Sequence, residues 1–228
     1  MIPLGSRQCR RVGLLGGSFN PAHAGHRHIS LLALRLLGLD QVWWLVSPQN
    51  PLKQAKGMAP FAERLAQAAQ VARHPRIRVS GIEARFGTRY TVDTLTELRR
   101  RFPDTQFIWL MGADNLMQIR HWRHWTRIFS LMPIAVFDRP AYSGKALASL
   151  AAKRYAAFRR PASAGHRLGD SGTPAWTFFA AATHPASATA IRERRSSALR
   201  LSQRPTRPST ALTGTSSTGT SSTGTSIT

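Results

Sequence analysis

The stretch that most constrains the fold runs from Val12 to His26 and reads VGLLGGSFNPAHAGH. A short apolar run ends in Gly16-Gly17, a turn containing proline follows, and two histidines stand three residues apart where a long apolar-periodic segment begins. This order predicts a strand, a loop and a helix. Glycines let the backbone approach a bulky anion, and a helix N-terminus offers unpaired N–H donors and a positive dipole end. We therefore expect a phosphate-binding loop here, with His23 and His26 as further donors.

The rest of the chain alternates short apolar runs with helical patterns. We predict strands at residues 11–15, 41–47, 77–80, 106–111, 133–137 and 175–180. We predict helices at 26–37, 60–72, 91–101 (with Thr91 as N-cap), 145–158 and 189–199, and shorter helical pieces at 116–117 and 125–130. Segments 82–91 and 161–174 are expected to be irregular. Because the strands lack polar alternation, the pattern favours a Rossmann-like, doubly wound parallel sheet in one α/β domain.

The ends of the chain differ in character from this domain. We expect residues 1–10 to be a flexible N-terminus, residues 11–200 to form the domain, and residues 201–228 to be a disordered tail. The tail contains a five-residue repeat of glycine, threonine and serine, which cannot bury enough apolar surface to offset its ordering entropy.

Cysteine count and hydropathy indicate the compartment. Cys9 is the one cysteine, so no internal disulfide can form, and a reducing cytoplasm is expected. No run of 18 or more apolar residues is present, so we predict no membrane span, and no apolar segment typical of a signal peptide follows the first basic residues.

The charge of the chain has two interpretations. Lys and Arg total 32 against 10 for Asp and Glu, which gives +22. A basic surface is typical of nucleic-acid binding, but it also suits an arginine-rich protein with a basic site for small phosphorylated substrates. The arginines are scattered, without interleaved aromatic residues or a known nucleic-acid-binding motif. We therefore predict no nucleic-acid partner.

Several polar residues follow the predicted strands at their carboxyl ends, where doubly wound sheets bind ligands. Asn50 and Lys53 follow the second strand, Asp114 follows the fourth, and Ser187-Ala188-Thr189-Ala190-Ile191-Arg192 follows the sixth. From the residues alone, Lys53 is either a phosphate ligand or a solvated lysine, and the last segment is either a capped helix or a phosphate site.

These motifs together resemble one family. His23-Ala24-Gly25-His26 matches the H-x-G-H pattern of the nucleotidyltransferase superfamily, and the segment from Ser187 to Arg192 is similar to its second motif. The stretch from Gly16 to His26 resembles the opening of bacterial nicotinate-nucleotide adenylyltransferases, although Asn20 and Ala22 stand where Asp and Pro are common. The resemblance implies an ATP site made of Gly16, Gly17, Ser18, Phe19, Gly25, His26, Gly112, Asp114, Arg139, Ser187, Thr189 and Arg192. His23, His26 and Arg192 would be its catalytic residues.

The resemblance also implies the second substrate. Gly87–Leu95 and His121–Trp125 are similar to family segments that bind a pyridine mononucleotide. The helix N-terminus at Tyr90 and Thr91 would bind the nicotinate carboxylate, and Trp122 would stack on the pyridine ring. Asn50 and Lys53 would line the mononucleotide side. For Trp125, at helical spacing from Phe129, packing is the preferred interpretation.

The reaction so implied is transfer of AMP from ATP to nicotinate mononucleotide, with Mg²⁺ arriving on the ATP and no protein-held metal. The attacking phosphate oxygen is already anionic, so no general base is required. The alternatives are another acceptor (nicotinamide mononucleotide or phosphopantetheine), a basic nucleic-acid-binding protein without catalysis, or an inactive chain, because the C-terminus departs from the family. The sequence predicts no particular oligomeric state.

Overall fold

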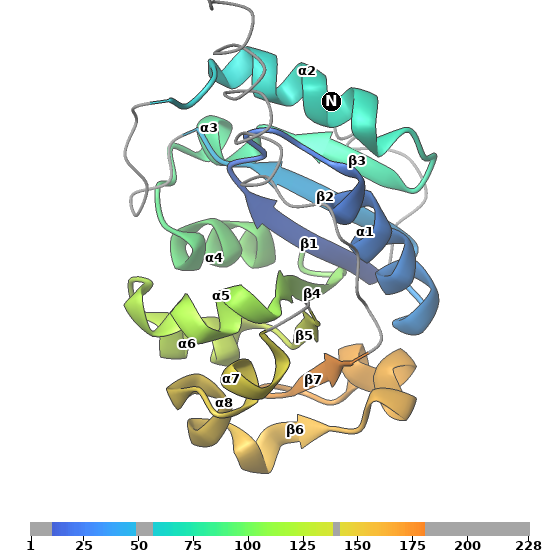
Figure 1. Cartoon of the computed structure of the whole chain (residues 1–228), viewed down its shortest axis with the longest axis vertical. Helices are drawn as coiled ribbons and strands as arrows, with labels where there is room; N and C mark the ends of the chain where they lie inside the picture. The colour runs from blue at the N-terminus through green and yellow to red at the C-terminus, as the bar shows by residue number, and fades with distance from the viewer. Residues whose placement is uncertain (1–10, 49–56, 139–141, 181–228) are drawn as a thin grey trace, which may run out of the picture.

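The computed structural model describes residues 11–48, 57–138 and 142–180, and these form one sheet with helices on both faces (Figure 1). The strand order is β3-β2-β1-β4-β5-β7-β6, and every pairing is parallel. The strands are β1 (Arg11–Gly17), β2 (Gln41–Val46), β3 (Ile77–Ser80), β4 (Gln106–Gly112), β5 (Ile134–Phe137), β6 (Arg159–Arg160) and β7 (Trp176–Phe179). The predicted Rossmann-like α/β fold is confirmed.

Two apolar clusters, one on each face of the sheet, form the core. Alternate residues of a strand point to opposite faces, so Leu14 lies in one cluster and Leu15 in the other. The cluster that holds Leu15 is covered by α1 (Ala24–Leu36), α2 (Phe61–Ala72) and the 3₁₀ helix η3 (Ala162–Asp170). The other is covered by α3 (Ile82–Phe86), α4 (Thr91–Arg101), α5 (Ala113–Gln118), η1 (Ile119–His121), α6 (Trp125–Leu131), α7 (Ser143–Leu147) and α8 (Leu150–Arg154).

The direction of winding reverses between β1 and β4. From β1 the chain moves outward through β2 to β3, and then returns to lay β4 against the other side of β1. The carboxyl ends of β1 and β4 are therefore neighbours at a topological switch point, which is where open α/β sheets bind their ligands.

Several sequence predictions of local structure were wrong. Segment 82–91 is not irregular, because it contains α3, which ends at Gly87 in a left-handed conformation (φ +65°). Segment 145–158 is not one helix: the Ser149 side chain accepts the N–H of Ala152 and starts α8 separately from α7, and η2 (Ala156–Phe158) follows. Segment 161–174 contains η3, and the two-residue strand β6 was not predicted.

Two helix starts also differ from the prediction. Helix α1 begins at Ala24 with His23 as its N-cap, and Tyr90, not Thr91, is the N-cap residue of α4. Strand β1 extends to Gly17, because its pairing with β2 continues through both glycines.

Other predictions fall on parts of the chain outside the described residues. These are the flexible N-terminus at 1–10, the helix at 189–199 and the tail at 201–228. Within the described ranges, no helix combines the length and apolar character needed to cross a membrane.

Candidate functional site

The two histidines of the H-x-G-H element form the N-terminal cap of α1. The Nδ1 atom of His23 accepts the N–H of Gly25 at 3.1 Å, and the Nδ1 atom of His26 accepts the N–H of His23 at 3.2 Å. The N–H of His26 in turn donates to the carbonyl oxygen of His23 at 3.0 Å. Two of the helix-terminal N–H groups that the sequence analysis assigned to a phosphate are therefore bonded within the cap.

The cap fixes which nitrogen of each ring carries the proton. A ring nitrogen that accepts a hydrogen bond bears no proton, so in both rings the proton lies on Nε2. His23 and His26 are thus both Nε2–H donors. Their ring centroids are 3.8 Å apart, and His23 is 5% exposed, so the pair is held in one arrangement.

Buried side chains from the turn after β1, from β2 and from α1 hold His26 in place. Its ring packs against Phe19, with 4.7 Å between centroids, and Phe19 stacks on Trp44 of β2 at 5.0 Å. The indole N–H of Trp44 donates to the Ser30 hydroxyl at 2.7 Å, and this hydroxyl donates to the carbonyl of His26 at 2.8 Å. Trp44 and Ser30 are positioning residues that the sequence analysis did not identify.

The two glycines at the end of β1 differ in the space that the protein leaves for a side chain. A Cβ added to Gly16 would lie 2.3 Å from the ring of Trp109, so protein packing forbids a side chain there. A Cβ added to Gly17 would meet only ordinary contacts, with the ring of Phe19 at 3.6 Å. At Gly17 the protein itself leaves room, and the Ser47 N–H donates to its carbonyl at 2.9 Å.

The end of β4 carries the next candidates. Gly112 is the N-cap residue of α5, and Asp114 lies in its first turn, at the switch point beside β1. Trp109 of β4 connects this region to the turn after η1, because its ring stands edge-on to that of Trp122 at 6.4 Å. The ring centroid of Trp125 lies 6.1 Å from that of Phe129 and 5.9 Å from that of Tyr155, in agreement with the packing role expected for Trp125.

The N-terminus of α4 meets the same turn. The guanidinium carbon of Arg123 lies 4.7 Å over the ring of Tyr90, so the α4 N-terminus and the residue after Trp122 are in contact. The carbonyl of Tyr90 accepts the N–H groups of Asp93 and Thr94. As the first helical residue, Thr91 has an N–H with no carbonyl in its own helix to bond. The structure thus brings Tyr90, at the start of α4, against the residue that follows Trp122, and Arg123 was not identified from the sequence.

Two buried charged residues near the end of β2 also escaped the sequence analysis. Arg64 of α2 is 1% exposed, and Glu83 of α3 is 8% exposed. Burial raises the pKa of Glu83 to about 7, although a hydrogen bond with the Ser47 side chain acts to lower it. A signal for Arg64 existed, because its spacing of four from Ala68 and eight from Ala72 puts it on the buried face of the helix.

Some candidates cannot be placed. All the residues expected after the second and last strands, and Arg139 after the fifth, lie outside the described part of the chain: Asn50, Lys53, Arg139, Ser187, Thr189 and Arg192. In the described part, no three His, Cys, Asp or Glu residues group closely enough to hold a metal ion.

Solved structures with this fold support the architecture. A Plasmodium falciparum nicotinic acid mononucleotide adenylyltransferase complexed with NaAD matches with a TM-score of 0.59 at 14% identity, over 81% of this chain and 83% of that one. The same enzyme complexed with APC matches with a TM-score of 0.57 over the same shares. At this identity the likeness shows the fold.

Sequence relatives show the family. The cytidylyltransferase-like family model matches residues 14–194. A protein of Parvibaculum lavamentivorans named "Probable nicotinate-nucleotide adenylyltransferase" is 55% identical over 184 residues, covering 81% of this chain and 92% of the relative. A protein of the same name from Cereibacter sphaeroides is 51% identical over 181 residues, covering 79% and 95%. This chain therefore belongs to the cytidylyltransferase-like family, among its nicotinate-nucleotide adenylyltransferases.

Proposed function

We propose that this protein transfers AMP from ATP to nicotinate mononucleotide, giving deamido-NAD and pyrophosphate. A phosphate oxygen of the mononucleotide attacks the α-phosphorus of ATP, the new P–O bond forms, and the bond to the β-phosphate breaks. The observation that carries the proposal is the capped histidine pair, which fixes two Nε2–H donors at the switch point of the sheet. The names of the relatives point to the same reaction.

The histidines stabilise charge in this reaction. The nucleophile is anionic at neutral pH, so catalysis consists of positioning and of stabilising the charge on the phosphorus centre and the leaving pyrophosphate. Neutral Nε2–H donors suit that task, because they bind phosphate oxygens without having to give up a proton. Arg192, outside the described residues, would neutralise the β- and γ-phosphates, since its fork can bind two oxygens.

The remaining ATP contacts are proposed from the family resemblance. Gly17 leaves space for a phosphate beside the backbone, and Gly16, Ser18, Phe19 and Gly25 support the turn. Gly112 and Asp114 at the end of β4 would face the nucleotide, with Arg139, Ser187 and Thr189 as further contacts. Asn50 and Lys53 would line the mononucleotide side.

The acid form of the pyridine is recognised at the N-terminus of α4. The N–H groups there and the positive dipole end favour a carboxylate over a neutral amide. Tyr90 and Thr91 stand at this end, and Trp122 offers its ring to the pyridine. The Arg123 guanidinium, stacked on Tyr90, adds positive charge beside them.

A divalent metal belongs to the substrate in this proposal. Nucleotidyltransferases generally take ATP with a divalent ion, and we propose that the ion is Mg²⁺, held by the phosphates of ATP. The α1 cap agrees with this, because it offers imidazole N–H donors, which bind phosphate oxygens. We also propose a cytoplasmic location, in keeping with the single cysteine.

A pyrophosphate-release assay tests the function. Purified protein with ATP and Mg²⁺ should release pyrophosphate with nicotinate mononucleotide, and at least about tenfold more slowly with nicotinamide mononucleotide, because one lost charge interaction is worth roughly 1.4 kcal/mol or more. Phosphopantetheine should give none. Absence of release with every acceptor, together with steeply salt-dependent binding to duplex DNA, would instead support the nucleic-acid-binding alternative.

A further inference from the structure

Arg64 is a buried cation that no carboxylate neutralises within the described residues. It lies on the inner face of α2 with Ala68 and Ala72, and 1% of it is exposed. Among the described residues, ion pairs join Arg11 to Asp170, and Glu97 to two arginines of α4, but none involves Arg64. A buried charge must be compensated by hydrogen bonds, so the partners of Arg64 indicate why it is there.

Those partners are backbone carbonyl oxygens from three separate segments. Nη1 donates to the carbonyl of Ser18 at 2.6 Å and to that of Ser47 at 2.7 Å. Nη2 donates to the carbonyl of Pro48 at 2.7 Å, and Nε donates to that of Ala59 at 2.9 Å. Ser18 directly follows β1, and Ser47 and Pro48 directly follow β2. One guanidinium therefore joins the carboxyl ends of two adjacent strands to the segment before α2.

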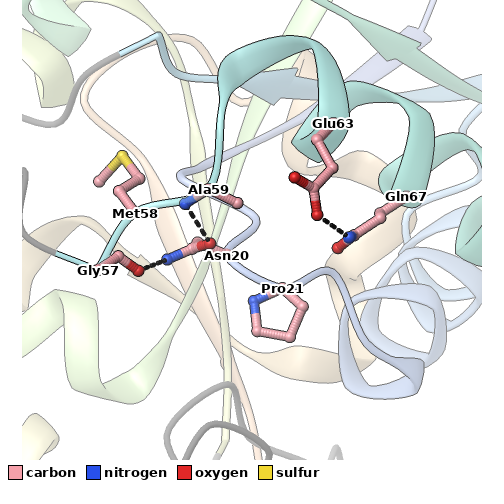
Figure 2. Close-up of a pocket in the computed structure, with 7 residues that line it drawn as sticks. All are labelled: Asn20, Pro21, Gly57, Met58, Ala59, Glu63 and Gln67. Carbon is pink, nitrogen blue, oxygen red and sulfur yellow. Dashed lines mark hydrogen bonds between the residues drawn. The ribbon is translucent and has the colours of Figure 1, made fainter.

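A second contact ties the same segments together. The side-chain amide of Asn20 donates to the carbonyl of Gly57 at 3.1 Å, and its oxygen accepts the N–H of Ala59 at 3.2 Å (Figure 2). These residues line a hollow of about 330 Å³ beside the turn. The turn after β1 is thus fastened to the 57–59 segment by both Arg64 and Asn20, and Arg64 also reaches the end of β2.

Fixing the Ser18 carbonyl also fixes the N–H of the same peptide group. In a planar trans peptide the C=O and the following N–H point in opposite directions, so Arg64 sets the direction of the Phe19 N–H. The nitrogen of Phe19 lies 3.9 Å from the place where a Gly17 side chain would begin. Arg64 therefore orients a backbone donor next to the space that Gly17 leaves.

We propose that Arg64 is a positioning residue for nucleotide binding, which holds the turn after β1 and the exit of β2 in the arrangement that receives the triphosphate. The inference rests on the proposed function. Arg64 acts through the backbone of the turn after β1 and of the exit of β2, so its removal should lower both the affinity for ATP and the rate.

The test uses Arg64→Lys and Arg64→Gln, with Arg11→Met as the matched control. Lysine keeps the charge, but one ammonium cannot reach all three segments, and glutamine keeps two N–H donors without a buried charge. Arg11 also donates to several groups, including Asp170 and the carbonyl of His166, but at the start of β1, the far end of the strand. All three variants should lower the Tm.

The readouts separate positioning from stability. At a temperature where all the variants are folded, kcat/KM for ATP should fall about 10- to 100-fold in both Arg64 variants and stay within twofold of wild type in Arg11→Met, because small displacements of a reacting group cost about that much. Equal losses in Arg11→Met, or unchanged kcat/KM in the Arg64 variants, would overturn the inference.

Hydrogen exchange provides a readout that does not depend on activity. Amides of residues 16–20 should exchange faster in the Arg64 variants, and those of Arg11→Met should match wild type. If wild-type protein releases no pyrophosphate, the proposed function fails, and the exchange result alone decides about Arg64. Unchanged exchange at residues 16–20 in both Arg64 variants would refute the positioning role.

Discussion

The rings of Trp109 and Trp122 stand edge-on, with 6.4 Å between their centroids and 84° between their planes. The far end of the Trp109 ring also covers Gly16, where a Cβ would lie 2.3 Å from it. One buried indole therefore supports both the strand that leads to the phosphate turn and the ring proposed to stack on the pyridine. In a reaction whose catalysis is positioning, a shared rigid support keeps the two substrates in register.

Replacing Trp122 should affect one substrate only. Trp122→Leu keeps apolar packing but removes the stacking face, so KM for nicotinate mononucleotide should rise about 10- to 100-fold, since stacking of a base on an aromatic ring is worth roughly 1–3 kcal/mol. KM for ATP should change little. Trp125→Leu is the matched control: it removes contacts with Phe129 and Tyr155 and should lower Tm without raising KM. Similar KM values in the two variants would refute the stacking role.

The two glycines after Leu15 should respond in opposite ways to alanine. Gly16→Ala forces a methyl group against Trp109 and should destabilise the fold by about 1–3 kcal/mol, as overpacking typically does. Gly17→Ala meets only ordinary contacts, so its Tm should stay close to that of wild type, while ATP binding weakens because the methyl group occupies the space proposed for a phosphate. Thermal melts and ATP titrations of both variants check this. A Gly17→Ala protein with wild-type affinity would show that no phosphate approaches there.

These glycines also show how far the sequence alone could lead. The stretch from Val12 to His26 predicts its strand, turn and helix because the signals are local: an apolar run, two glycines and a proline. That Gly16 is required by Trp109 could not be foreseen, because the two meet only through the pairing of β1 with β4, across 93 residues of sequence. The local motif could be predicted from the sequence, but the tertiary contact that supports it could not.

The same reason explains the other differences. Helix α3 has five residues, too few for a helical period to be visible, and β6 has two. The Arg64 guanidinium donates hydrogen bonds to backbone carbonyls of three segments, and no sequence pattern predicts these contacts. His23 and His26 were predicted as donors to a phosphate, and the structure adds the cap that directs their protons to Nε2.

Two substitutions of His26 should separate its capping from its chemistry. In His26→Asn the side-chain oxygen takes the place of Nδ1 and can still accept the N–H of His23, but the Nε2 donor is lost. We expect a stability within about 1 kcal/mol of wild type and a kcat at least about 100-fold lower, as for loss of one preorganised donor. Steady-state pyrophosphate release and thermal melts measure the two quantities.

His26→Gln makes the complementary change. Its amide nitrogen lies near the position of Nε2 and can still donate, whereas the cap acceptor is lost. This variant should lose about 1 kcal/mol of stability and retain more activity than His26→Asn. If His26→Asn turned over at the wild-type rate, the assignment of His26 as a donor to phosphate would be wrong.

Glu83 should make stability depend on pH in the neutral range. Burial raises its pKa from 4.5 to about 7. The folded protein therefore holds more protons than the unfolded chain between these values, and its stability falls as pH rises through this window. Glu83→Gln removes the ionisation but keeps an oxygen that can accept from Ser47. Relative to wild type, the variant should gain up to about 3 kcal/mol between pH 5 and pH 8, a limit set by 1.36 kcal/mol per pKa unit.

Urea unfolding of the two proteins at pH 5, 6, 7 and 8, followed by tryptophan fluorescence, measures this difference. Glu97→Gln is the control, because hydrogen bonds from Arg100 and Arg101 lower the pKa of Glu97. Ionised Glu97 stabilises the folded state at pH values above the pKa that it has in the unfolded chain, and this stabilisation is lost only as pH falls below that value. Glu97→Gln should therefore leave the pH dependence of the free energy of unfolding between pH 5 and pH 8 unchanged. Parallel curves for wild type and Glu83→Gln would show that the Glu83 carboxyl titrates alike in the folded and unfolded chains, and that its burial beside Ser47 carries no charge penalty.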